Sequence, residues 1–255
     1  MNYGELFDLT GKAAVVTGAS SGIGRAIALG LAAHGADVLV AERNPERTAE
    51  SAQQVAALGR RSAVFELEVS SRDSARAMAE KAMEEFGRID ILVNSAGMNI
   101  RKPILEIKDE DWDPVLTVNL KGTLYCCQAV GRYMVEQKRG KILNVASISS
   151  KLGHPARGAY ASSKGGLIQL TKVMATEWAP YNICVNAISP AAVDTPFIDG
   201  LKKDRQRLDR ELERIPLGRI ATPDDVVGAA VFLLSPASDF ITGHNLIIDG
   251  GRTVD

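Results

Sequence analysis

Short apolar runs alternate with longer amphipathic segments along nearly the whole chain. A strand followed by a helix of about a dozen residues pairs in parallel with a neighbouring strand, and the crossover is right-handed. The alternation is therefore typical of an α/β fold in which a doubly wound parallel sheet carries helices on both faces. We expect the strands at Lys12–Thr17, Asp37–Ala41, Ser62–Val69, Ile89–Asn94, Lys141–Val145, Ile183–Ile188 and Asn245–Ile248.

The helices are indicated by apolar periodicity, by residues that start helices and by glycine stops. We expect them at Gly22–His34, Pro45–Leu58, Arg72–Phe86, the long region Asp109–Gln137, Gly158–Ala179, Asp199–Arg214 and Pro223–Leu234. The pattern breaks after Pro190, where a charge-rich segment begins. We expect residues from about 191 to 215 to form a mobile cover over the substrate at the sheet edge.

Composition limits the partners of the chain. Its 255 residues, 45% hydrophobic and 24% charged, fit one globular domain spanning 1–255. Thirty basic and 31 acidic side chains give a net charge of -1, and no dense basic cluster indicates a nucleic-acid partner. The N-terminus does not read as a signal peptide, and no apolar run reaches the ~18 residues of a membrane helix. We expect a cytoplasmic protein with a small-molecule substrate and no membrane partner.

Three cysteines, Cys126, Cys127 and Cys184, show no metal-like spacing, and the histidines are scattered. We expect buried thiols and no metal site.

A glycine-rich turn, TGASSGIG, joins the first strand to the first helix. Gly18 permits a tight turn, Gly22 lets the backbone approach a pyrophosphate, and Gly24 allows the helix to pack closely on the strand. A turn between a strand and a helix is the setting in which a dinucleotide binds to the helix N-terminus. The other residues of the turn that we expect in the cofactor site are Ser20, Ser21 and Ile23.

Glu42 ends the second strand, about eighteen residues after the last glycine of the turn, where a carboxylate accepts hydrogen bonds from the adenosine ribose. A carboxylate there repels the 2′-phosphate of NADP, and the neutral Ser21 does not offset that repulsion. Arg43 acts in the opposite direction, because its guanidinium can bind a phosphate. We expect NAD as the preferred cofactor and NADP as a possible one.

The segment SISSKLGHPARGAYASSK places Lys164 four residues after Tyr160, which is about one helical turn. A neighbouring ammonium favours the ionised form of a phenol. Tyr160 is therefore expected to donate and accept protons near neutral pH, with Ser147 thirteen positions before it.

Several motifs occur together in one order, namely TGASSGIG at 17–24, NSAG at 94–97, Asn119, Ser147, YASSK at 160–164 and NAISP at 186–190. Through them the chain resembles the short-chain dehydrogenase/reductase family over nearly its whole length. The resemblance implies a single-domain Rossmann-type fold with a seven-stranded parallel sheet and an NAD(P) cofactor. It also implies a homotetramer, assembled through two long helices and the C-terminal region.

The resemblance also implies roles for individual residues. Ser147 would hold the substrate oxygen, and Tyr160 would be the proton donor and acceptor. Lys164 would bind the nicotinamide ribose and act on the tyrosine, and Asn119 would belong to a water-linked proton relay. Further cofactor contacts implied in this way are Asn94, Ala96, Gly97, Pro190, Val193, Thr195 and, near the adenine, Glu68 and Val69. Glu68 is one methylene longer than the family's usual aspartate, and Ala191 replaces its usual glycine.

Within the family the chain is similar to the gluconate 5-dehydrogenase and 2-deoxygluconate 3-dehydrogenase group, through segments such as GMNIRKP and RIPLGR. Arg101 and Lys102 follow the fourth strand, and Arg157 precedes Tyr160, at strand ends where ligands bind in this fold. These cations either hold a sugar-acid carboxylate or serve only solubility. Side chains expected to line the substrate pocket without an assigned role are Ser149 and His154.

The leading hypothesis is thus an NAD(P)-dependent oxidoreductase that acts on a sugar acid or polyol. One alternative is a 3-oxoacyl-carrier-protein reductase, against which Glu42 and Ser21 count. A second alternative, from another class, is a catalytically idle scaffold, which the intact set of Asn119, Ser147, Tyr160 and Lys164 disfavours.

Overall fold

One sheet of seven parallel strands organises the computed structural model, which describes residues 3–254. The strands are β1 (Ala13–Thr17), β2 (Asp37–Glu42), β3 (Ser62–Glu66), β4 (Ile91–Asn94), β5 (Gly140–Val145), β6 (Ile183–Pro190) and β7 (Asn245–Ile248). They pair in the order β3-β2-β1-β4-β5-β6-β7. The doubly wound α/β fold predicted from the alternating pattern is confirmed.

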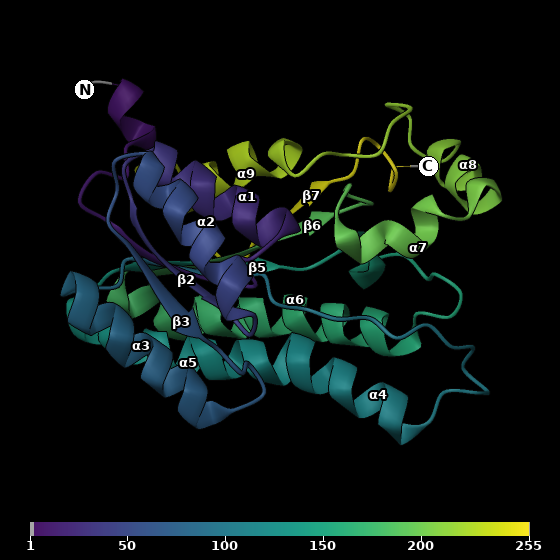
Figure 1. The fold of residues 1–255 in the computed structure, drawn as a ribbon, viewed down its shortest axis with the longest axis horizontal. Coiled ribbons are helices and arrows are strands. Elements are labelled where there is room, and N and C mark those ends of the chain that lie inside the picture. Colours follow the sequence, from purple (N-terminus) through teal and green to yellow (C-terminus); the bar gives the residue numbers. More distant parts are fainter. Residues whose placement is uncertain (1–2, 255) are drawn as a thin grey trace.

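Helices cover both faces of this sheet. They are α1 (Gly22–Ala33), α2 (Pro45–Ala57), α3 (Arg72–Phe86), α4 (Asp109–Leu116), α5 (Thr123–Gln137), α6 (Gly158–Trp178), α7 (Asp199–Lys202), α8 (Arg205–Leu212) and α9 (Asp224–Leu234). Figure 1 shows α1, α2 and α9 on one side of the sheet and α3, α5 and α6 on the other. The short helices α7 and α8 stand beside the sheet, next to the C-terminal end of the chain (Figure 1).

The core explains why the strands are apolar on both faces. In β1, Ala14 and Val16 pack into the core under α1 and α9, whereas Ala13 and Val15 pack into the core under α3 and α5. Successive side chains of a strand point to opposite faces, so a strand covered on both faces must be apolar throughout. Every residue of β1 is accordingly buried.

Local side chains decide where several helices begin and end. The side chain of Asn44 accepts a hydrogen bond from the backbone N–H of Arg47 at 2.9 Å and caps α2. Ser71 caps α3 in the same way through the N–H of Ser74 at 3.2 Å. Gly87, with a φ of 73°, ends α3 in the left-handed conformation that glycine adopts without strain.

The predicted helical region Asp109–Gln137 is not one continuous helix. A π-helical turn, η2 (Thr117–Gly122), separates α4 from α5. A π turn holds one residue more than an α turn, and apolar periodicity over a long window does not reveal a single inserted residue. The turn places Asn119 fully inside the protein.

Two other boundaries differ from expectation. β3 ends at Glu66, because the carboxylate of Glu68 accepts hydrogen bonds from the N–H and hydroxyl of Ser70, at 2.9 and 2.6 Å, and forms a turn. The charged segment forms two helices, α7 and α8, because the carboxylate of Asp204 accepts the N–H of Arg207 at 3.1 Å and starts a new helix.

Two of the three cysteines are fully buried, as expected. They are Cys126 and Cys127, and burial raises the pKa of the Cys126 thiol to about 12. Cys184 is only half-buried, against expectation. Within residues 3–254 no group of three or more His, Cys, Asp or Glu side chains is arranged to hold a metal ion. No helix in that part of the chain combines the length and apolarity needed to cross a membrane.

Candidate active site

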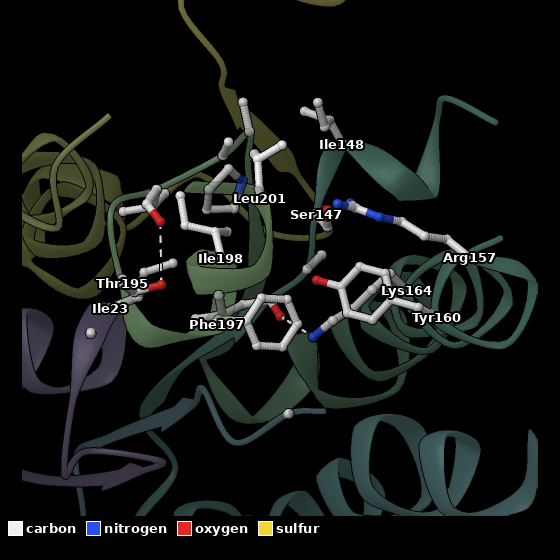
Figure 2. A pocket seen from close by; sticks show the side chains of 18 of the residues that line it. Ile23, Ser147, Ile148, Arg157, Tyr160, Lys164, Thr195, Phe197, Ile198 and Leu201 are labelled. Carbon is white, nitrogen blue, oxygen red and sulfur yellow. Dashed lines mark hydrogen bonds between the residues drawn. The ribbon is translucent and has the colours of Figure 1, made fainter. Parts of the chain in front are cut away.

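A cavity of about 550 Å³ lies where the glycine-rich turn, the carboxyl ends of β4, β5 and β6 and the segment after β6 meet. Parallel sheets bind ligands at this edge, where the strand order reverses. Figure 2 shows side chains from Ile23 in α1 to Leu201 in α7 converging on the cavity, with Ser147, Tyr160 and Lys164 between them. The cavity therefore connects the expected cofactor turn with the expected catalytic residues.

Ser147, Tyr160 and Lys164 meet at the centre of the cavity. Ser147 follows β5 and accepts the backbone N–H of Ser149 at 3.1 Å, which fixes its side chain. Tyr160 and Lys164 lie one turn apart on α6, with the lysine amino nitrogen 5.7 Å from the centre of the tyrosine ring. The same amino group donates a hydrogen bond to the carbonyl oxygen of Val145 at 2.7 Å (Figure 2).

Burial dominates the protonation of these groups. It raises the pKa of the Tyr160 phenol, although a hydrogen bond with Ser147 and the charges of Arg157 and Arg101 act in the opposite direction. Burial also lowers the pKa of Lys164 to about 8. The net shift for Tyr160 is thus opposite to the one expected from a neighbouring ammonium. The reason is that burial of the phenol disfavours its charged form more than the neighbouring groups favour it.

Asn119 lies behind the cavity and is held on three sides. Its Oδ1 accepts the N–H of Met98 at 2.8 Å, and its Nδ2 donates to the carbonyl of Met98 at 2.9 Å and to the hydroxyl of Ser163 at 3.0 Å. A Cβ atom added to Gly97 would lie 3.3 Å from Asn119 Oδ1 and 3.7 Å from Lys164 Nζ. Asn119 and Lys164 therefore flank the same backbone position, but both N–H groups of the Asn119 amide are already donated.

The glycine-rich turn fits a dinucleotide. Gly18 has a φ of 66°, and a Cβ atom there would lie 2.6 Å from the backbone nitrogen of Ala96. A Cβ atom on Gly24 would collide with the carbonyl oxygen of Gly18. Ser21 precedes α1 but makes no capping hydrogen bond with its side chain, so the first N–H groups of this helix remain available to an anion.

Most of the predicted cofactor residues line the cavity. These are Gly18, Ser21, Gly22, Ile23, Gly24, Glu42, Ala96, Gly97, Tyr160, Lys164, Pro190, Val193 and Thr195. Glu42 ends β2, and its Oε1 accepts the N–H of Arg43 at 2.8 Å. The side chain oxygen of Thr195 donates to the carbonyl of Val193 at 3.2 Å (Figure 2).

Five predicted cofactor residues do not line the cavity, namely Ser20, Arg43, Glu68, Val69 and Asn94. The Nδ2 of Asn94 donates to Asn144 Oδ1 at 2.9 Å and to the sulfur of Cys127 at 3.2 Å, so this side chain joins β4 to β5 inside the protein. Hydrogen bonds from Ser70 hold the carboxylate of Glu68 and lower its pKa. The side chain of Val69 packs against Gly122. The side chains of Asn94 and Glu68 are thus engaged within the protein, outside the cavity.

The predicted cations separate into two kinds. Arg101 and Arg157 line the cavity, and their loops are joined by a backbone bridge between Lys102 and Arg157. Burial lowers the pKa of both guanidinium groups, and for Arg101 the charge of Arg157 adds to the effect. Lys102 instead pairs with Asp111 at 2.6 Å, away from the cavity. No acidic side chain of residues 3–254 forms an ion pair with either arginine.

His154 lines the cavity, and Ser149 supports it from behind. The hydroxyl of Ser149 lies 3.2 Å from His154 Nδ1. Burial, followed by the charge of Arg157, lowers the pKa of His154, so the ring is neutral at pH 7. A neutral imidazole with one nitrogen engaged presents the other nitrogen to a ligand.

Several cavity residues were not predicted. They include Ile148, Phe197, Ile198, Leu201, Arg207, Arg210, Glu211 and Arg214. The Phe197 ring lies 5.7 Å from that of Tyr160, at an angle of 44° (Figure 2). Most of these residues belong to the segment after β6, whose charge-rich composition indicated a cover but not which side chains face inward.

Comparison with known proteins shows the family. A family model described as "Enoyl-(Acyl carrier protein) reductase" matches residues 18–253. A short-chain type dehydrogenase/reductase from Mycobacterium marinum has the same fold, with a TM-score of 0.95 and 35% identity over 98% of this chain and 99% of that one. The chain is a short-chain dehydrogenase/reductase. As a member of that family it is a nicotinamide-dependent oxidoreductase.

Curated relatives of this dehydrogenase/reductase include enzymes of sugar acids. The 2-dehydro-3-deoxy-D-gluconate 5-dehydrogenase of Escherichia coli is 42% identical over 96% of both chains. The gluconate 5-dehydrogenase of Gluconobacter oxydans is 39% identical over 100% of this chain and 99% of the relative. A 3-oxoacyl-[acyl-carrier-protein] reductase, FabG, of Thermotoga maritima is also 39% identical, over 96% and 99%. The similarity to the gluconate 5-dehydrogenase group is confirmed.

Solved structures add the cofactor. A gluconate 5-dehydrogenase from Burkholderia cenocepacia, in complex with NADP and tartrate, is 37% identical with a TM-score of 0.95, over 98% of each chain. A structure from Agrobacterium tumefaciens with bound NADP is 38% identical with a TM-score of 0.91, over 98% of this chain and 99% of that one. Nicotinamide cofactors thus bind to close structural neighbours of this dehydrogenase/reductase.

Proposed function

We propose that this dehydrogenase/reductase interconverts a secondary alcohol and a ketone on a sugar acid. One observation carries the proposal. The same cavity is lined by Tyr160, by Ser147 and by two arginines that form no ion pair within residues 3–254, Arg101 and Arg157. A carboxylate bound by Arg101 and Arg157 would be held by charge-assisted hydrogen bonds beside the phenol. The gluconate 5-dehydrogenase relatives, whose substrate is such an acid, support the same conclusion.

The roles of the residues follow from their positions. When bound, the nicotinamide cofactor supplies or accepts the hydride. Tyr160 protonates the carbonyl oxygen during reduction and accepts the alcohol proton during oxidation, while Ser147 holds that oxygen. Lys164 lies where it can bind the ribose. Asn119 holds the backbone of Met98, and its engaged amide supports the shape of the site more than a direct proton transfer.

For the cofactor, we propose that both NAD and NADP are used, with Glu42 limiting NADP. Glu42 faces the cavity, as expected for a residue that binds the ribose hydroxyls. NADP in similar structures supports its use here, so the preference for NAD predicted from the sequence rests on Glu42 alone. Arg43, the next residue in the chain, offers the cation that a 2′-phosphate requires.

The Arg101→Gln variant tests recognition of the carboxylate. We expect KM for gluconate to rise about tenfold or more, because a charge-assisted hydrogen bond is lost, and KM for a neutral polyol such as threitol to change little. Lys102→Gln is the matched control, since that ammonium is paired with Asp111 outside the cavity. Equal effects of Arg101→Gln on acid and polyol would contradict the proposal.

A second candidate is the reduction of a 3-oxoacyl thioester, favoured by the 39% identity to the Thermotoga maritima reductase. A screen of sugar acids, polyols, keto acids and acetoacetyl thioester with both cofactors distinguishes the two, through absorbance of the reduced nicotinamide. Turnover of the thioester at a kcat/KM above that of every sugar acid would favour the second candidate.

A further inference from the structure

Glu211 is the one carboxylate among the charged side chains at the substrate end of the cavity. It lies in α8, which comes directly after α7 in the segment that covers the cavity. Its side chain is 19% exposed, whereas the neighbouring Arg207, Arg210 and Arg214 are exposed at the rim. Figure 1 shows α8 beside the C-terminal end of the chain, from which Arg252 reaches Glu211.

The hydrogen-bonding capacity of Glu211 is unused. Its closest polar contact is with Arg252, whose Nε lies 3.8 Å from Glu211 Oε1. Within residues 3–254 no hydrogen bond reaches this carboxylate, and the buried Nε of Arg252 has no hydrogen-bond partner either. At 19% exposure the Glu211 side chain is partly buried, and its carboxylate can accept hydrogen bonds from a ligand in the cavity that it lines. The cavity is the side from which donors can come.

The surroundings of Glu211 decide what kind of donor fits. Its charge acts on Arg101, Arg157 and His154, all of which line the same end of the cavity. A cationic ligand would be repelled by these arginines. A second carboxylate of the substrate would be repelled by Glu211 at short range. Neutral hydroxyl groups meet neither obstacle, and O–H···O⁻ hydrogen bonds are short and strong.

We propose that Glu211 is a specificity-determining residue that accepts hydrogen bonds from the hydroxyl groups of the substrate, with Arg252 as the residue that positions it. The inference rests on the proposed function, since the substrate carboxylate is assigned to Arg101 and Arg157. The two arginines attract the substrate carboxylate and Glu211 repels it. The acid is thereby oriented with its carboxylate at Arg101 and Arg157 and its hydroxylated chain along α8.

Two acids of equal length separate the roles of Glu211 and Arg101. Gluconate and hexanoate share six carbons and a carboxylate, but only gluconate carries hydroxyl groups. We measure their dissociation constants by calorimetry on the enzyme with NADP. Glu211→Gln should weaken gluconate about tenfold without weakening hexanoate, since a hydrogen bond from a hydroxyl group to the charged carboxylate is lost. Glu213→Gln, an exposed change just after α8, is the control and should alter neither value.

The positioning role of Arg252 has its own test. Arg252→Gln should weaken gluconate but not hexanoate, and Arg252→Lys, which keeps the charge, should restore much of the loss. If Glu211→Gln fails to fold, these two Arg252 variants still test the proposal.

Equal weakening of both acids by Glu211→Gln, or no weakening of either, would overturn the role of Glu211 alone. Arg101→Gln should weaken both acids. If it affects neither, the proposed function is wrong as well, and failure of the wild type to bind gluconate would overturn both proposals.

Discussion

The phenol of Tyr160 is buried, contacts Ser147 and lies within the field of two arginines. Removing its hydroxyl in Tyr160→Phe takes away the proton donor without changing the ring that packs against Phe197. We expect kcat to fall by about 10²- to 10⁴-fold, the usual contribution of a positioned acid or base. Titration of tryptophan fluorescence with the reduced cofactor should give an unchanged dissociation constant. Retained turnover would show that Tyr160 is not the proton donor.

Lys164 is buried with its pKa lowered to about 8, from an ordinary value of 10.5. The folded protein therefore binds fewer protons than the unfolded chain between these two values, so the free energy of unfolding rises with pH in this window. The full shift corresponds to about 3 kcal/mol.

Lys164→Met removes this dependence. Relative to the wild type, the variant should be most stabilised below pH 8 and should lose that advantage towards pH 10.5, while turnover is abolished. Urea denaturation at about pH 7, 8.5 and 10 measures the difference. A constant difference across these three values would show that folding does not shift the pKa of Lys164.

At the scale of residues, the contacts between catalytic side chains could be predicted from the sequence more accurately than the environment of each side chain. Tyr160 and Lys164 lie together because spacing on a helix determines proximity, and Ser147 meets them from the end of β5. Asn94 lies in the predicted strand, but its side chain points into the core towards Asn144. A sequence motif predicts the position of the backbone, whereas the side-chain rotamer depends on the packing around it. The upward pKa shift of Tyr160 depends on burial, which no local pattern reports.

At the scale of elements, we expect the end of β2 to influence the choice of cofactor. Glu42→Ser removes a negative charge that faces the cavity, so kcat/KM with NADP should rise at least about tenfold relative to NAD. Arg43→Gln should change the ratio in the opposite direction. Initial rates with both cofactors measure the effect, and a ratio unmoved by either variant would mean that the 2′ position lies away from this turn.

Strands and helices with clear boundaries were predicted within a few residues. α2 and α3 begin at the expected Pro45 and Arg72, because Asn44 and Ser71 cap them. The break between α7 and α8 and the short β3 were missed, because side chains such as Asp204 and Glu68 redirect the backbone locally. Side chains of this kind are common in helices and strands as well, so their capping role becomes visible only in three dimensions.

At the scale of the whole molecule, the family resemblance predicts a homotetramer. If α6 forms part of the interface, Val173 is a suitable position to test, because it is 51% exposed on this helix. Val173→Arg should place a charge in that interface and reduce the assembly, whereas Lys172→Ala, beside it, should not. Light scattering should give about four times the 27.3 kDa of one chain for the wild type. A wild-type mass of one chain would refute the tetramer.

The whole fold could be predicted because alternation of strands and helices allows few arrangements. The inward faces of α7 and α8 could not, because an exposed helix and a helix that closes a cavity have similar charged compositions. Glu211 and the arginines around it were therefore found only from the structure.

The position of Asn119 in the active site depends on the number of residues in the π turn between α4 and α5. Deleting one residue from Thr117–Gly122 would let α4 and α5 join as one regular helix and would rotate α5 by about 100° relative to α4. Asn119 would then leave Met98 and Ser163, while the sheet remained intact. We expect a single-residue deletion here to displace Asn119 from the active site, an effect that a substitution at a neighbouring position of the turn does not have.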